Sequence, residues 1–268
     1  MKLFKLLSSI GLVLASALDS SAQGFSISPA RIFLTGNPGE TLSTTINISN
    51  SSDQQLSFNT RLQDWDRDST GTKIYYASGT KTNSNSNWVS LTTNTVTIGP
   101  GETIQAALTM HVPTDARATT NSMLFFTQIA PQEKNNDPNK KIGINVLMEV
   151  GVQLYYIPPA LNHGDLEFID FQDFGLKSDS KVRKVALKIH NTGAINKDAF
   201  VRMELTNKET GEEIKIAAVP LAMLPEATQW VYIELPTNLK GNYLAVALLD
   251  AGKSYDLKVA EKEIIYTP

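Results

Sequence analysis

The chain has 268 residues and a formal net charge of -3, from 24 basic and 27 acidic side chains. This balance provides neither the basic surface that binds nucleic acid nor an acidic tail. Cysteine is absent, which excludes disulfides and thiolate metal sites, so packed cores alone must hold the fold together. The length suits two domains of ordinary size.

The first 22 residues have the features of an export signal. Lys2 and Lys5 precede an apolar run over 6–18, and Ser20-Ser21-Ala22 follows as a cleavage site of small residues. The apolar run is short for a membrane span, and no later run approaches that length. We expect cleavage after Ala22 and an exported chain with no membrane insertion.

Short strands and turns are expected from Phe25 onward. Apolar residues recur with a period of two between turns rich in glycine, proline and asparagine, which is typical of strands with one buried face. A more continuous apolar run, Met123 to Phe126, predicts a central, buried strand. About seven strands in about 135 residues indicate an immunoglobulin-like sandwich with Greek-key connections.

The stretch from Lys141 to Pro159 predicts one long strand. Apolar residues alternate with glycine or polar residues from Ile142 to Leu154, and Pro158-Pro159 ends the pattern because proline cannot donate to a ladder. We expect a domain hinge at these prolines. An apolar strand at the end of a domain also offers a place where another polypeptide adds its own strand.

After Pro159 the pattern begins again. The segment Val185 to Leu205 repeats the layout of Thr45 to Leu62, and no segment has a helical period. The predicted fold class is all-β, with two immunoglobulin-like β-sandwich domains in tandem. Residues 23–158 are expected to form the first domain and 159–268 a smaller second one.

Motifs that carry catalysis are absent from the sequence. The three histidines have no metal-ligand spacing, and no nucleophile elbow, phosphate loop or dinucleotide motif is present. We expect no catalytic residue, no metal and no cofactor. The segment Asp64 to Gly71 is similar to half of a calcium loop, but Ser69 stands where glycine is required. Its aspartates are alternatively turn residues.

Three further side chains leave alternatives open. Trp65 and Trp88 either form a stacking platform for carbohydrate or pack into a sandwich core. Arg31 lies between Pro29-Ala30 and Ile32-Phe33, where a guanidinium needs a partner unless its strand turns it to solvent. With a side chain directed into a groove between the domains, Arg31 would bind a carboxylate in bidentate fashion.

Together these segments resemble the PapD-like periplasmic chaperones of the chaperone-usher pilus pathway. The resemblance covers most of residues 25–160. It rests on the following segments: Ser28-Pro29-Ala30-Arg31, the turn at Asn50, Gly99-Pro100-Gly101-Glu102 with its strand, Met123-Leu124-Phe125-Phe126, and Ile144 to Pro158.

The resemblance implies a periplasmic chaperone that completes a pilus or surface-fibre subunit by donating a strand, in partnership with an outer-membrane usher. By position the donated row is Ile144, Val146 and Met148. Arg31 matches an arginine that anchors the client's terminal carboxylate, but Gln153 stands where the family has its anchoring lysine. Ile157 likewise replaces an arginine that makes a charged contact between domains.

Two functions follow as hypotheses. The first is a divergent chaperone that acts by donor-strand complementation, with Arg31 and Gln153 as the anchor of the client carboxylate. The alternative is a non-enzymatic protein of the cell envelope whose sandwiches bind glycan or peptidoglycan through Trp65 and Trp88.

Overall fold

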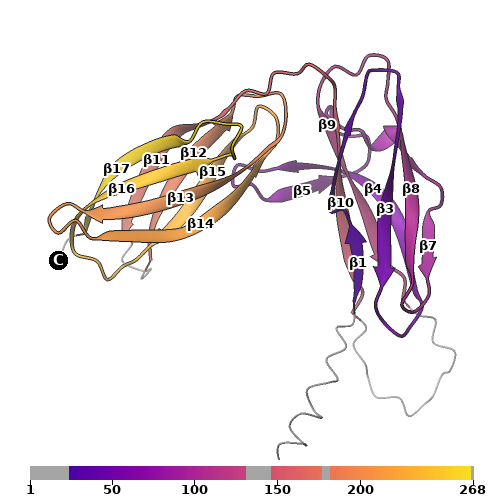
Figure 1. Ribbon diagram of the computed structural model, residues 1–268, viewed down its shortest axis with the longest axis horizontal. Coiled ribbons are helices and arrows are strands. Elements are labelled where there is room, and N and C mark those ends of the chain that lie inside the picture. Colours follow the sequence, from indigo (N-terminus) through magenta and orange to yellow (C-terminus); the bar gives the residue numbers. More distant parts are fainter. Residues whose placement is uncertain (1–23, 131–145, 177–181, 267–268) are drawn as a thin grey trace, which may run out of the picture.

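The computed structural model describes residues 24–130, 146–176 and 182–266. In these residues the regular structure is β, apart from one 3-10 turn, η1 (Ser86–Trp88). Figure 1 shows two sandwiches, one in each half of the chain, set at an angle. The predicted fold class, two tandem immunoglobulin-like sandwiches, is confirmed.

The N-terminal sandwich consists of two sheets. One has the order β1-β3-β8-β6, and the other has the order β2-β10-β9-β4-β5, with β7 paired to β4. The strands are β1 (Phe25–Ser28), β2 (Arg31–Thr35), β3 (Thr41–Asn50), β4 (Leu56–Arg67), β5 (Lys73–Tyr76), β6 (Val89–Leu91), β7 (Thr95–Ile98), β8 (Thr103–His111), β9 (Thr120–Gln128) and β10 (Glu149–Ile157).

The C-terminal sandwich pairs a sheet of order β11-β12-β15 with one of order β14-β13-β16-β17. Its strands are β11 (Leu166–Leu176), β12 (Arg183–Asn191), β13 (Lys197–Asn207), β14 (Glu213–Met223), β15 (Thr228–Leu235), β16 (Gly241–Asp250) and β17 (Lys258–Tyr266).

Each sandwich has its own apolar core, built from the inward positions of facing strands. Ile46 and Ile48 of β3 are fully buried in the N-terminal core, in one cluster with Phe126 of β9. Val201 of β13 and Leu187 of β12 are equally buried in the C-terminal core. Side chains at alternate positions fill the space between the sheets, as the period of two predicts.

The long strand expected over Lys141 to Pro159 is correct for β10 and wrong for residues 146–148. Met148 accepts a hydrogen bond from the backbone NH of Gln128 at 2.9 Å, and β9 ends at Gln128. Without a partner strand beyond that point, Val146 to Met148 belong to no strand. Ile144 lies outside the described residues.

The expected export signal, residues 1–22, also lies outside the described residues. No helix in residues 24–130, 146–176 or 182–266 is long and apolar enough to cross a membrane. The domain division at Pro158 stays a prediction, although separate pairs of sheets lie before and after it.

Candidate functional site

The first half of β10 has an open edge. On one side β10 pairs with β9 along its length, from Glu149 opposite Thr127 onward, whereas on the other side β2 pairs with it only from Gln153. The pairing alternates, so the NH and C=O groups of Glu149 and Gly151 point away from β9. In the described part of the chain no strand covers these groups.

Exposed apolar side chains precede this open edge. The exposed fractions are 77% for Val146, 48% for Leu147 and 43% for Met148. Val146 and Met148 line a cavity of about 430 Å³ that opens beside Phe25 of β1 and Leu56 of β4. Two residues of the predicted donor row, Val146 and Met148, are therefore exposed beside this cavity, and their role stays a prediction.

Arg31 and Gln153 are neighbours across the β2 and β10 pair. Arg31 Nη1 lies 2.5 Å from Asp198 Oδ2 on β13, so the guanidinium reaches the C-terminal sandwich and has a carboxylate partner there. Gln153 Oε1 accepts a hydrogen bond from the Tyr155 hydroxyl at 2.7 Å. The contact of Asp198 with Arg31 could not be predicted from the sequence, because no pattern in β13 indicates that this strand approaches β2.

Trp65 belongs to the apolar contact between the two sandwiches. Its ring has no exposed surface, its Nε1 donates to Ser122 O at 3.0 Å, and it packs in one buried cluster with Tyr155 and with Leu224 of the C-terminal sandwich. Trp88 is half-buried and lies edge-on to a buried tyrosine of β10. Of the two alternatives for these tryptophans, packing into a core is confirmed and the carbohydrate platform is wrong, because one ring is enclosed and the other packs against the N-terminal core.

The hairpin of β4 and β5 carries two cations next to Trp65. Arg67 and Lys73 are directly opposite each other across the hairpin. Both side chains lie on the same side of the sheet as Trp65. The Arg67 guanidinium lies 5.5 Å and Lys73 Nζ 5.9 Å from the centre of the Trp65 ring, both within cation–π range. Sequence reasoning missed both cations, since only the placement of the hairpin brings them to this face.

The tip of this hairpin touches the C-terminal sandwich. The backbone NH of Trp230 on β15 donates to Ser69 O at 2.7 Å. Figure 1 shows β5 extending from the N-terminal sandwich toward β15. The hairpin is therefore a further contact between the sandwiches, in addition to the Arg31–Asp198 pair, the Trp65 cluster and the chain that links β10 to β11.

Two of the three aspartates of the calcium-like segment, Asp64 and Asp68, accept hydrogen bonds from the chain itself. Asp64 is buried; its Oδ2 accepts from the backbone NH of Thr80 and Lys81 at 2.8 Å, and its Oδ1 accepts from serine hydroxyls. Asp68 Oδ1 accepts from the backbone NH of Thr70 at 2.8 Å, which makes it a turn residue. Burial would raise the pKa of Asp64, but the donated hydrogen bonds outweigh burial and the pKa lies below its usual value.

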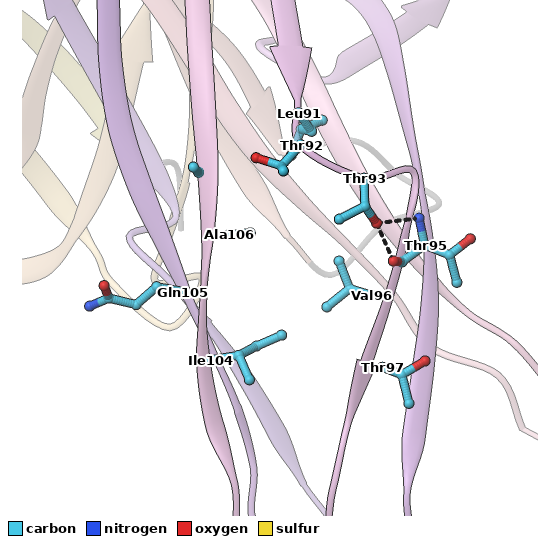
Figure 2. A pocket seen from close by; sticks show the side chains of 10 residues that line it. Leu91, Thr92, Thr93, Thr95, Val96, Thr97, Ile104, Gln105 and Ala106 are labelled. Carbon is cyan, nitrogen blue, oxygen red and sulfur yellow. Dashed lines mark hydrogen bonds between the residues drawn. The ribbon is translucent and has the colours of Figure 1, made fainter.

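A second cavity, of about 310 Å³, lies between β8 and the segment that joins β6 to β7. Figure 2 shows its threonine-rich wall, in which the Thr93 hydroxyl accepts from the backbone NH of Thr95 at 3.1 Å. Every polar side chain in the wall is a neutral threonine or glutamine. This wall provides no acid, base or nucleophile pair for catalysis.

No protein-family model matches the chain, and no curated protein matches it.

Among solved structures, the chain is structurally similar to chaperones of fimbrial and pilus assembly. One is the YadV chaperone, with 12% identity over 90% of this chain and 99% of that chain and a TM-score of 0.49. Another is a chain of the CsuC–CsuE chaperone–tip adhesion subunit complex from archaic chaperone-usher pili of Acinetobacter baumannii, with 14% identity over 89% and 97% and a TM-score of 0.49. A chain of a chaperone–tip adhesin complex of CFA/I fimbriae biogenesis is similar at 12% identity over 89% and 98%, also with a TM-score of 0.49. Sequence identities this low do not carry a function from one protein to another.

Proposed function

We propose that the protein is a non-enzymatic periplasmic chaperone for pilus or surface-fibre subunits. It completes its client by donating the strand around Ile144 to Met148, and it delivers the client to an outer-membrane usher. The observation that carries the proposal is the open edge of β10 at Glu149 and Gly151. The exposed residues Val146 and Met148 lie directly before this edge in the chain.

Two physical contributions hold the client. The client's strand satisfies the unpaired NH and C=O groups along β10, which gives affinity that depends little on sequence. Burial of Val146 and Met148 in the client then adds about 1.5 to 3 kcal/mol for each fully buried side chain. No nucleotide or cofactor takes part, because strand addition and apolar burial supply the free energy.

Replacement of Val146 by arginine tests this proposal. The variant and the wild type are each co-expressed in the periplasm with a candidate fibre subunit, and the co-purified client is quantified. We expect the retained client to fall about tenfold or more, because a guanidinium would have to enter an apolar groove.

The matched control is Val259→Arg. Val259 is 53% exposed on β17 of the C-terminal sandwich, far from the donor segment in the chain. Its replacement introduces the same charge and is expected to leave client retention unchanged. Equal retention by Val146→Arg and the wild type would refute strand donation at this segment.

A further inference from the structure

We propose that the free edge of β5 is a second place of strand addition, which binds an extended polypeptide segment with alternating acidic and apolar side chains. β5 is the last strand in the sheet order β2-β10-β9-β4-β5, so β9 and β4 lie between its free edge and β10. A polypeptide at β5 is therefore a partner distinct from the strand that adds to β10. The inference goes beyond the proposed function, because it needs no client at β10.

Backbone groups of β5 point to this free edge. β5 pairs with β4 in an antiparallel ladder, and at its start Asp68 N donates to Thr72 O at 3.0 Å. Because the bonds of such a ladder alternate, Ile74 also faces β4 while the NH and C=O groups of Lys73 and Tyr75 face outward. In the part of the chain that the structure describes, no strand covers these outward groups. They can bond to an added strand.

Large apolar side chains stay exposed along the same edge. The exposed fractions of three successive residues are 40% for Ile74, 44% for Tyr75 and 36% for Tyr76. Ile74 and Tyr76 lie on one face of the hairpin and Tyr75 lies on the other, because side chains alternate along a strand. Natural edge strands usually carry charge or proline, which discourage pairing with another chain. Exposed apolar residues on both faces of β5 favour strand addition instead.

The face that carries Tyr75 has an excess of positive charge. Lys73 lies opposite Arg67 on this face. Arg67 Nη1 donates to a backbone oxygen, Gly71 O, at 2.6 Å, and the half-buried Lys73 makes no hydrogen bond or ion pair through Nζ with any described residue. Burial lowers the pKa of Lys73, and repulsion from Arg67 and Arg31 lowers it further. An acidic side chain of an added strand would stabilise the Lys73 ammonium.

The opposite face of the hairpin has balanced charge. Lys81 Nζ lies 2.8 Å from Asp66 Oδ2, and it also lies 5.0 Å from the centre of the Tyr76 ring. Ile74 is directly opposite Asp66 and offers an apolar contact on this face. The added strand should therefore place acidic side chains toward Lys73 and apolar side chains toward Ile74, which is a pattern with a period of two.

Synthetic peptides blocked at both ends test the edge. In one peptide glutamate and valine alternate, and in the other glutamine and valine alternate. Each is titrated into the chain from Gln23 onward and followed by NMR with residue-level amide exchange. We expect the glutamate peptide to bind roughly tenfold more tightly than the glutamine peptide. Exchange should slow at Lys73 and Tyr75 and change little at Ile74 and Tyr76, whose amides already face β4.

Two variants separate the contributions of charge and apolar contact. Lys73→Gln should remove most of the preference for glutamate, and Ile74→Ser should weaken both peptides roughly fivefold. The matched controls are Lys215→Gln and Ile169→Ser. Lys215 lies on β14 with its side chain 74% exposed, and Ile169 is 50% exposed on β11. Both controls should bind the two peptides as the wild type does.

Three results would overturn the inference. Equal binding of the two peptides by the wild type, or a glutamate preference that persists in Lys73→Gln, would refute an acidic partner. Exchange that slows at Glu149 and Gly151 but not at Lys73 and Tyr75 would assign the peptide to β10 and refute the site on β5. Self-association of the chain alone that Ile74→Ser abolishes would show that a second copy occupies the edge in place of another partner.

The two proposals fail separately. Val146→Arg leaves β5 unchanged and should bind the glutamate peptide as the wild type does. If Val146→Arg loses the fibre subunit while the peptide leaves exchange at Lys73 and Tyr75 unchanged, strand donation stands and the site on β5 is wrong. If the peptide slows exchange at Lys73 and Tyr75 while Val146→Arg retains the fibre subunit, the site on β5 stands and strand donation is wrong.

Discussion

Replacement of Gly71 by alanine should loosen the hairpin from the C-terminal sandwich. Gly71 has φ +85°, and a Cβ atom added there would lie 2.2 Å from Gln229 Nε2 and 2.6 Å from Gln229 Cδ. Gln229 is itself buried, so its amide has little room to move away. The tip must shift, and the hydrogen bond from Trp230 N to Ser69 O is expected to break.

The size of the effect follows from two contributions. A left-handed conformation costs alanine about 1 to 2 kcal/mol. Loss of the Trp230 bond adds about 1 kcal/mol. Gly211→Ala is the matched control, because Gly211 has φ +74° and a Cβ atom there would meet nothing within 4 Å. We therefore expect Gly71→Ala to destabilise the protein by about 1 kcal/mol more than Gly211→Ala does.

Urea unfolding measures the difference in free energy, and amide exchange at Trp230 reports the contact itself. Exchange at Trp230 should accelerate in Gly71→Ala and stay unchanged in Gly211→Ala. Equal destabilisation by the two variants, with unchanged exchange at Trp230 in both, would refute the role of the hairpin as a contact that holds the sandwiches together.

Two further substitutions test the contacts beneath the hairpin. Asp64→Asn should cost about 2 kcal/mol near neutral pH, because hydrogen bonds to the charged carboxylate are lost. The lowered pKa of Asp64 contributes stability above its unfolded-state pKa of about 3.9 that is lost as the pH falls through the folded-state value. The free-energy difference between variant and wild type, from urea unfolding at several pH values, should therefore shrink below about pH 4, and a constant difference would contradict this. Trp65→Ala should lower the free energy of unfolding by about 3 to 5 kcal/mol and remove a contact with Leu224 of the C-terminal sandwich. Calorimetry should then resolve two unfolding transitions, one for each sandwich. A single transition would count against coupling of the sandwiches through Trp65.

Strands with a regular alternation of apolar and polar residues could be predicted from the sequence. Two strands with an interrupted alternation, β11 and β14, could not. In β11 the register shifts between Phe168 and Asp170, so apolar residues on either side of the shift fall out of phase. In β14, Pro220 lies within the strand, and the register shifts opposite Val201 to Met203 of β13. A prediction that assumes a constant period of two therefore fails to identify both strands.

The candidate site was predictable only where it lies along one strand. Gln153 and the row before β10 follow from local alternation and from the resemblance to the chaperone family. Asp198, Arg67 and Lys73 are set by contacts between segments distant in the chain, and no local pattern marks them. The roles predicted for Arg31, Gln153 and the donor row stay predictions.

Amide exchange at the edge of β10 tests strand addition most directly. The chain from Gln23 onward is compared alone and with a co-purified fibre subunit, with residue-level resolution by NMR. The amides of Glu149 and Gly151 point to the open edge, whereas those of the alternate residues Val150 and Val152 already face β9. Strand addition predicts that exchange at Glu149 and Gly151 slows about tenfold or more in the complex while Val150 and Val152 change little. Unchanged exchange at Glu149 and Gly151 in a stable complex would contradict it.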